Sequence, residues 1–341
     1  MTQQQPPFDP YAPIATQKPK KRGKWIARTA GLLVLLFVLT LVCVPLYAWS
    51  KITKVDAMPS GDRPVDTPGT TFLLVGSDSR EGLSDADKKR LGTGSIGGRR
   101  TDTIMLLHVP DSGGPTALIS LPRDSYVPIP DHGKNKLNAA FAFGGPKLLT
   151  RTIENVTGLR IDAYVEIGFG GFVSVIDSVG GIEMCLPKAM KDHDAHINLP
   201  AGCQELDGPK ALGYVRARKS DPKGDLGRVE RQREMVGAVA RKAVSPGTIL
   251  NPWRYYKVAT SGAEALSVDK DTGPLDLFKF ARAMQKVAGG KGVTLTVPVA
   301  DTNYETKNGS SAVKWDTDRA KALFAELKQD RTTNLSKYAQ S

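Results

Sequence analysis

The chain has 341 residues, of which 40% are hydrophobic and 24% are charged. This is the composition of a globular protein with room for one large domain or two ordinary ones, and it excludes a chain that is disordered throughout. The net charge of +12 favours an anionic partner such as nucleic acid, a membrane surface or an acidic polymer.

The N-terminal 24 residues carry Gln and Pro without apolar periodicity, which predicts a disordered tail over 1–24. The apolar stretch 25–49 is long enough to span a bilayer, for which about 20 residues suffice. A cleaved signal peptide is the competing interpretation, but the stretch is longer than the apolar core of a signal peptide. We therefore expect a transmembrane helix that anchors the protein in the cell membrane.

Basic residues cluster before this stretch, so the positive-inside rule places the N-terminus in the cytoplasm and the chain after Ser50 outside. That topology argues against nucleic acid as the partner. Cys43 lies within the apolar stretch, whereas Cys185 and Cys203 lie outside, in an oxidising compartment. A cysteine pair there more often forms a disulfide than a metal site, so we expect a disulfide between these two.

Pro, Gly and Asp punctuate residues 50–70, which predicts a linker. The domain is expected over 71–330, followed by a tail over 331–341. Three short apolar runs predict core strands, at 70–76, 102–110 and 116–122. A loop is expected over 127–145, a helix over 146–158, and intermixed strands and helices thereafter. This order predicts a single α/β domain of mixed topology.

Nucleophilic catalysis finds little support, because the sequence has no G-x-S-x-G elbow. The HDAH stretch at 193–196 could hold a metal, but its place between the two outer cysteines favours an ordinary surface loop. His108 alternates within an apolar strand, which indicates a structural role.

Acids and bases alternate where the predicted strands begin and end. The residues are Asp78, Arg80, Arg100, Asp102, Arg123 and Asp124. Antiparallel neighbours would bring these ends together. A magnesium pyrophosphate needs this mixture, because carboxylates hold the cation and arginines hold the remaining phosphate oxygens. Any one pair could equally be a surface salt bridge.

The segment 216–233 holds seven basic residues and three acids. Arg216 and Arg218 would point to one side of an extended segment, and Asp225 could cap a helix that starts near Leu226. Arg228 then shares a helical face with Arg231 or Gln232. The guanidinium fork fits phosphate oxygens two at a time, which favours a polyanion site over a solvated, salt-bridged helix.

These residues lie in ordered blocks: GSDSR, RTDTIML, SLPRDSYVPIP, KLNAAFAFGG, IDAYVEIGFGGFVSVIDSVGGI, LDGPKALGYVRARKSD and DLGRVERQR. With these blocks, the chain resembles the LytR-CpsA-Psr family of cell-wall glycopolymer ligases from about 71 to 244. The resemblance implies an α-β-α domain with a lipid-binding groove on the outer membrane face. It also implies transfer of a phospho-glycopolymer (arabinogalactan, teichoic acid or a capsule-like polysaccharide) from a polyprenyl-pyrophosphate carrier to peptidoglycan.

The resemblance also implies roles for single residues. Asp78 and Asp102 would hold Mg²⁺ or Mn²⁺, and Asp225 would orient the arginines or act as base. The other residues would grip the pyrophosphate or lie beside it: Arg80, Arg100, Arg123, Lys136, Arg216, Arg218, Arg228 and Gln232. Two other functions stay open, namely a lipid pyrophosphate hydrolase that uses the same site and a non-catalytic protein that binds an anionic wall polymer.

Overall fold

The computed structural model describes residues 22–78, 101–217, 224–306 and 308–339. Two compact units emerge, Met1–Cys43 and Val44–Ser341. Helix α1 (Arg22–Trp49) contains an apolar stretch, Trp25–Trp49, long enough to cross a membrane. The chain therefore has one candidate membrane span within the described residues.

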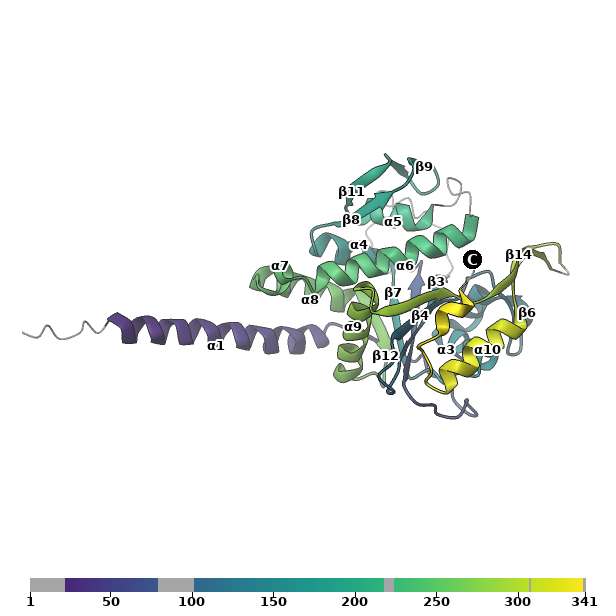
Figure 1. Cartoon of the computed structure of the whole chain (residues 1–341), viewed down its shortest axis with the longest axis horizontal. Helices are drawn as coiled ribbons and strands as arrows, with labels where there is room; N and C mark the ends of the chain where they lie inside the picture. Colours follow the sequence, from purple (N-terminus) through teal and green to yellow (C-terminus); the bar gives the residue numbers. More distant parts are fainter. Residues whose placement is uncertain (1–21, 79–100, 218–223, 307, 340–341) are drawn as a thin grey trace, which may run out of the picture. The chain divides into compact units, whose positions relative to one another are not determined.

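A mixed sheet of seven strands forms the centre of the larger unit (Figure 1). In spatial order its strands are β1 (Thr53–Val55), β12 (Leu266–Asp269), β7 (Ala163–Ile167), β2 (Thr70–Ser77), β3 (Thr101–Val109), β4 (Thr116–Ser120) and β13 (Gly292–Thr296). Strands β2, β3 and β4 are successive antiparallel neighbours, whereas β7, β13 and β1 each have a parallel neighbour. The predicted core strands are thus the middle of the sheet.

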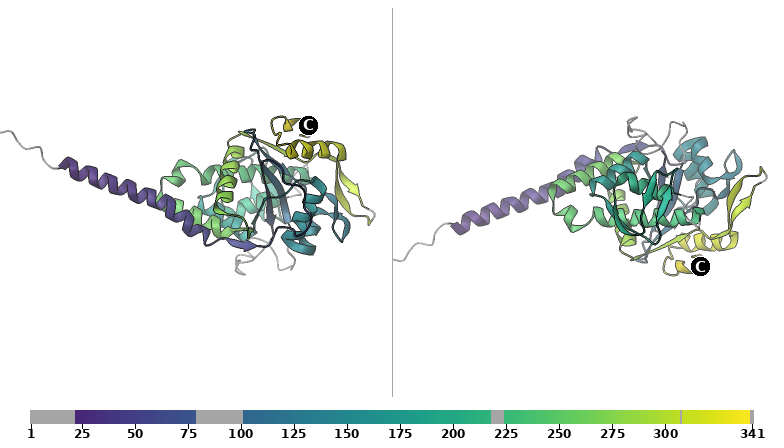
Figure 2. Two further views of the ribbon diagram at one scale, coloured as in Figure 1. Left: turned by 90° about the horizontal axis from the view of Figure 1, so that it is seen from below. Right: turned by 90° about the horizontal axis from the view of Figure 1, so that it is seen from above.

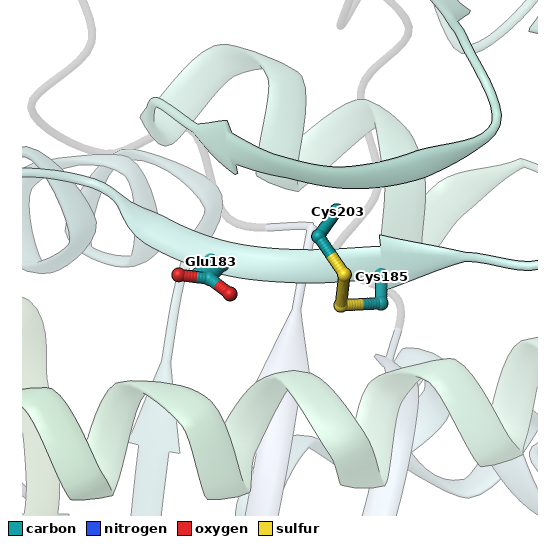
Figure 3. Close-up of side chains that lie close together, drawn as sticks. All are labelled: Glu183, Cys185 and Cys203. Carbon is teal, nitrogen blue, oxygen red and sulfur yellow. A yellow bond between two sulfur atoms is a disulfide. The ribbon is translucent and has the colours of Figure 1, made fainter.

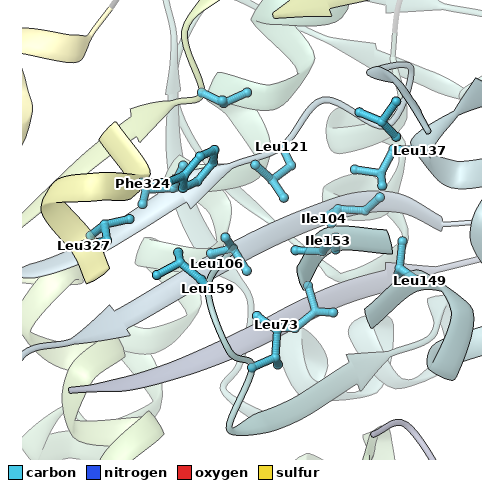
Figure 4. Close-up of a cluster of buried hydrophobic side chains, with 14 of the residues drawn as sticks. Leu73, Ile104, Leu106, Leu121, Leu137, Leu149, Ile153, Leu159, Phe324 and Leu327 are labelled. Atoms are coloured by element: carbon cyan, nitrogen blue, oxygen red, sulfur yellow. The ribbon is translucent and has the colours of Figure 1, made fainter. Parts of the chain in front are cut away.

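Helices cover both faces of this sheet (Figure 1). Along β3, Ile104 and Leu106 pack on the side of α3 (Leu137–Thr157) and α10 (Thr317–Lys328), whereas Met105 packs against α9 and α6. Since neither face meets water, the strands are continuous apolar runs rather than alternating ones. Figure 4 shows the first of these cores. The α-β-α architecture expected from the sequence is confirmed.

The remaining helices belong to the side of the sheet that carries α6. Their bounds are α4 (Phe169–Ser178), α5 (Gly208–Arg216), α6 (Gly224–Ala243), α7 (Pro246–Ile249), α8 (Pro252–Ala265) and α9 (Pro274–Ala288). Between α4 and α5 lie four short strands, β8 (Ile182–Leu186), β9 (Met190–Asp192), β10 (Ile197–Leu199) and β11 (Gly202–Leu206). With α5 and α6 they enclose a second, smaller core.

Cys185 on β8 and Cys203 on β11 lie directly opposite each other, and their sulfur atoms are bonded (Figure 3). Glu183 lies within 4.8 Å of both sulfur atoms. Because sulfur in a disulfide cannot act as a thiolate ligand, this group is no metal site. Cys43 is free and exposed.

The expectations for three segments were wrong: the linker over 50–70, the loop over 127–145 and the tail over 331–341. The linker predicted for 50–70 contains edge strand β1, and Ala57 is buried with its N–H donated to Asp269 at 2.8 Å. The loop predicted for 127–145 forms hairpin β5 (Tyr126–Ile129) and β6 (Gly133–Lys136) and the first turns of α3, which kinks at Gly144.

The predicted tail holds the 3₁₀ helix η1 (Leu335–Tyr338), whose Leu335 is fully buried. The wrong predictions all concern short segments with few apolar residues. Such segments become ordered because neighbouring elements bury them, and the local sequence does not indicate that burial. Hairpin β14 (Val299–Glu305) and β15 (Ser311–Trp315) completes the unit and projects from it (Figure 2).

Candidate active site

A bulge at the start of β3 sets the position of Asp102. Gly76 pairs with Thr103 and Ser77 pairs with Thr101, so Asp102 is the extra residue on its strand. Such a bulge re-aims a side chain without breaking the sheet. Asp78 follows β2 directly and is half-buried. Both acids that the family resemblance assigns to the metal therefore lie at the same end of the β2–β3 pair.

Asp124 forms ion pairs with the basic residues near this strand end. Arg123 pairs with Asp102 through Nη1 and donates from Nε to Asp124 Oδ2 at 3.2 Å. Lys136 Nζ lies 3.2 Å from Asp124 Oδ1, and Arg228 Nη2 lies 4.0 Å from Asp124 Oδ2. Asp124 is buried, and its carboxylate thereby links the sheet, hairpin β5–β6 and helix α6.

A cavity of about 310 Å³ opens beside this cluster. Its lining comes from β3, α5, α6, the last residue of β9 and the loop between β9 and β10. It consists of Asp102, Asp192, Asp194, Ala195, Val215, Arg216, Arg228 and Gln232. Arg228 and Gln232 are four residues apart on α6 and are both buried. The structure thus brings the strand-end acid and the basic segment to one cavity.

Two contacts fix the basic wall of this cavity. Arg216 is the last residue of α5, and its guanidinium carbon lies 5.1 Å from the ring centroid of Phe169. Arg231 turns away from the cavity and donates to the backbone carbonyls of Tyr214 at 3.3 Å and Ala217 at 2.7 Å. Arg231 therefore holds the end of α5 against α6, whereas Arg228 and Gln232 face the cavity.

The conformation expected at Arg216 was wrong, because this residue ends a helix instead of lying in an extended segment. Arg80, Arg100 and Arg218 lie outside the described residues. Asp225 lies in the first turn of α6, and its side chain is likewise outside the described part.

Two acids of the cavity were not predicted. Asp192 and Asp194 belong to the β9–β10 hairpin, which the sequence presented as a solvated loop. Asp192 Oδ1 accepts hydrogen bonds from the N–H groups of Asp194 at 3.0 Å and Ala195 at 3.1 Å, which shapes the turn. Their place at the cavity follows from the packing of α5 against β10, to which no sequence motif points.

A larger cavity, of about 890 Å³, lies on the other side of α6. Apolar residues of β8, α6 and α9 form part of its lining, namely Ile182, Met184, Ala238, Val287 and Ala288. Six charged residues also line it, among them Arg233, whose pKa is lowered by burial. Gly237, in the middle of α6, also lines this cavity and places no side chain in it.

The LytR_cpsA_psr family model matches residues 48–329 of this chain. The probable cell wall biosynthesis protein LcpB of Corynebacterium glutamicum is 49% identical over 91% of this chain and 72% of its own length. The polyisoprenyl-teichoic acid–peptidoglycan teichoic acid transferase TagU of Oceanobacillus iheyensis is 29% identical over 85% of this chain and 89% of its own.

A solved LytR-Csp2A-Psr enzyme from Actinomyces oris superposes with a TM-score of 0.62 at 24% identity. The superposition covers 82% of this chain and 96% of that one. At this identity the likeness bears on the fold, which is the same.

Proposed function

This chain belongs to the LytR-CpsA-Psr family, and we propose that it transfers a phospho-glycopolymer from a polyprenyl-pyrophosphate carrier to peptidoglycan. The single observation that carries the proposal is the small cavity. Arg216, Arg228 and Gln232 line it together with Asp102, which is paired to Arg123. Basic forks beside a strand-end carboxylate suit a pyrophosphate bound with a cation.

In the proposed reaction a hydroxyl oxygen of the peptidoglycan sugar attacks the phosphorus that carries the glycan. The bond from this phosphorus to the bridging oxygen breaks, and polyprenyl phosphate leaves. The hydroxyl proton passes to a base, for which we propose Asp225. The arginines offset the negative charge that grows on the leaving phosphate, so positioning and electrostatics suffice without a protein nucleophile.

The residues at the strand ends fit a divalent cation such as Mg²⁺ or Mn²⁺. Asp78 and Asp102 would hold it, and Mg²⁺ commonly takes one or two carboxylates and completes its shell with water and substrate phosphates. In the described part of the chain these two acids belong to no cluster of three metal-ligating groups, which suits a cation that arrives with the pyrophosphate. Bound there, the cation would neutralise phosphate charge.

We assign the lipid chain of the carrier to the larger cavity, because apolar groups of three elements meet there beside α6. Helix α6 separates the two cavities, with Arg228 and Gln232 lining one and Gly237 and Ala238 lining the other. The pyrophosphate and the lipid of one donor would thus bind on neighbouring faces of a single helix.

The topology proposed with this function puts the N-terminal tail in the cytoplasm and the domain outside, where the peptidoglycan is. Six basic residues and one acid precede Ser50, which favours this orientation. An oxidising exterior would also preserve the Cys185–Cys203 disulfide.

The test is transfer of a lipid-linked glycan to peptidoglycan by the purified full chain and its Arg216→Ala variant. We expect the variant to lose transfer by about 100-fold or more while its thermal unfolding stays that of the wild type. Arg151→Ala, which removes an exposed arginine of α3, is the matched control and should transfer normally. Wild-type transfer by the Arg216 variant would refute the site.

Omitting peptidoglycan from the same assay separates the alternatives. A transferase leaves the donor intact without acceptor, whereas a hydrolase releases polyprenyl phosphate at the same rate in both reactions. A protein that only binds anionic polymer consumes no donor in either reaction.

A further inference from the structure

A line of stacked rings joins the end of α1 to α8 within the Val44–Ser341 unit. The ring centroids of Tyr47 and Tyr256 lie 6.3 Å apart, and those of Tyr256 and Trp253 lie 6.0 Å apart. Trp253 is 64% exposed, and the neighbouring Leu250 is 68% exposed. Large apolar side chains thus face solvent near Tyr47, two residues before the end of the candidate membrane span.

Two contacts give the direction of α8 relative to the end of α1. Tyr47 stacks on Tyr256, and Lys51 Nζ lies 4.0 Å from a carboxylate oxygen of Glu264. Both segments therefore run the same way, so the N-terminal end of α8 points back toward the membrane side of Tyr47. Trp253, three residues before Tyr256, lies about 4–5 Å farther in that direction.

The charge around these rings is positive. Lys257 Nζ lies 5.3 Å from the ring centroid of Trp253, Lys51 Nζ lies 5.5 Å from that of Tyr47, and Lys54 Nζ lies 4.3 Å from that of Trp49. Arg254 adds a further cation, and the sequence from 246 to 263 contains no acid. Aromatic rings with lysine and arginine are the side chains that settle at the headgroup layer of a membrane.

We propose that the α7–α8 corner is a second membrane contact, in which Leu250 and Trp253 enter the headgroup layer and Arg254 and Lys257 bind anionic phospholipid headgroups. The inference rests on the proposed membrane-spanning role of α1. Tyrosines and tryptophans at the end of a span lie at the interface, and Tyr256 is stacked on such a tyrosine. The contact holds the domain against the bilayer, where a lipid-linked donor resides.

The test uses the full chain with Cys43→Ser and Leu250→Cys, labelled at position 250 with a nitroxide and reconstituted in vesicles. Collision with oxygen, which concentrates in lipid, is compared with collision with a water-soluble nickel complex. A matched label at Phe143→Cys is the control, because Phe143 is also exposed (50%) but lies on α3, at the far end of the unit (Figures 1 and 2).

In vesicles with anionic phospholipid we expect the label at 250 to favour oxygen and the label at 143 to favour nickel. Replacing Arg254 and Lys257 with Gln, or using neutral vesicles, should lower the oxygen-to-nickel ratio at 250 by about twofold or more. Equal nickel access at both positions would overturn the contact, and a ratio independent of lipid charge would overturn its anionic partner. The readout involves neither donor nor acceptor, so it is independent of transfer.

Discussion

Asp124 is the residue at which three basic side chains of the candidate site meet. Its place among alternating acids and bases at strand ends is visible in the sequence. Its buried carboxylate lies between Arg123, Lys136 and Arg228, which are up to 104 positions away along the chain (124 to 228). These ion pairs form because α6 and hairpin β5–β6 both pack beside Asp124, and no local sequence pattern predicts that packing. The residue types of the site are therefore predictable, but their pairing is not.

Asp102 offers a direct test of the proposed cation. Asp102→Asn keeps the size of the side chain and its place in the bulge but removes the charge that would bind a divalent ion. We expect Mg²⁺ to support transfer about 100-fold less well, and Mg²⁺-dependent binding of pyrophosphate to weaken in parallel. Transfer rates and calorimetric titration with Mg²⁺ and pyrophosphate measure the two effects.

The control is Asp111→Asn, which removes an exposed acid at the opposite end of β3. Unchanged Mg²⁺ dependence in the Asp102 variant would exclude this carboxylate as a ligand.

His108 has a structural role, as expected from its alternation. It is fully buried, with Nδ1 3.0 Å from Thr71 Oγ1 and Nε2 3.0 Å from Asp330 Oδ1. A neutral ring satisfies both partners if Nε2–H donates to Asp330 and Nδ1 accepts from Thr71. The apolar strand around His108 predicts that its ring is buried. The contact with Asp330 is visible only in the folded chain, because Asp330 lies 222 positions away in the sequence.

This histidine predicts how stability depends on pH. Burial lowers the pKa of His108 below its ordinary 6.5, although the bond to Asp330 opposes the shift. The unfolded chain therefore takes up a proton near pH 6.5 that the folded chain does not. We expect full stability above this value and a progressive loss as pH falls from about 7 toward 5. Thermal unfolding across this range measures it.

His108→Gln should be less stable overall but flatter in its pH dependence over this window, whereas His132→Gln, at an exposed histidine, should keep the wild-type slope. A second loss of stability is expected in stronger acid, from Asp330. Burial raises the pKa of this carboxyl group, but hydrogen bonds from Ser112 and His108 outweigh burial and hold the pKa below its ordinary 3.8. An unaltered slope in the His108 variant would assign the titration to other groups.

At the scale of elements, strongly apolar segments were predictable and weakly apolar ones were not. The runs that became β2, β3 and β4 are apolar on both faces, because helices cover both sides of the sheet. The β9–β10 hairpin offered no such run, since each of its strands has three residues. The sequence therefore predicts a loop there, and it does not predict that the acids of this hairpin line the cavity.

Gly237 lies in the middle of helix α6, on the side that lines the larger cavity. A Cβ added at Gly237 would lie 3.5 Å from Arg241 Nη1 and 3.9 Å from Ala288 Cα, which is ordinary contact. Gly237→Ala should therefore fold and gain up to about 1 kcal/mol of stability, because alanine favours a helix more than glycine does. Gly237→Leu should fill part of the larger cavity.

If that cavity holds the lipid, the Gly237→Leu variant should transfer from a long-chain polyprenyl donor about tenfold more slowly than the wild type. A tenfold change corresponds to the loss of roughly two buried methylenes of the lipid. A short-chain donor should be used at the wild-type rate, and Gly237→Ala should use both donors normally. Equal rates with the long-chain donor in all three proteins would place the lipid elsewhere.

At the scale of the whole molecule, the sequence predicts where the domain stands relative to the membrane. Basic residues cluster before and in the first turns of α1, and the cysteine pair after it is in the bonded state. The membrane-proximal contacts were not predictable, because β1 pairs with a strand more than 200 positions away. Only Ser50–Ile52 separate α1 from β1, so the folded domain begins directly after the candidate membrane span.

Orientation is tested with alkaline phosphatase, which is active only outside the cytoplasm, fused after Ser341. We expect full reporter activity in cells that carry the wild-type chain. Changing the basic residues of the tail to Gln should lower that activity by reversing part of the population, because basic residues before a span are held in the cytoplasm. The matched control replaces an equal number of exposed basic residues in the domain and should leave reporter activity unchanged. An inactive reporter on the wild-type chain would place the domain in the cytoplasm, away from peptidoglycan, and the proposed transfer could not occur.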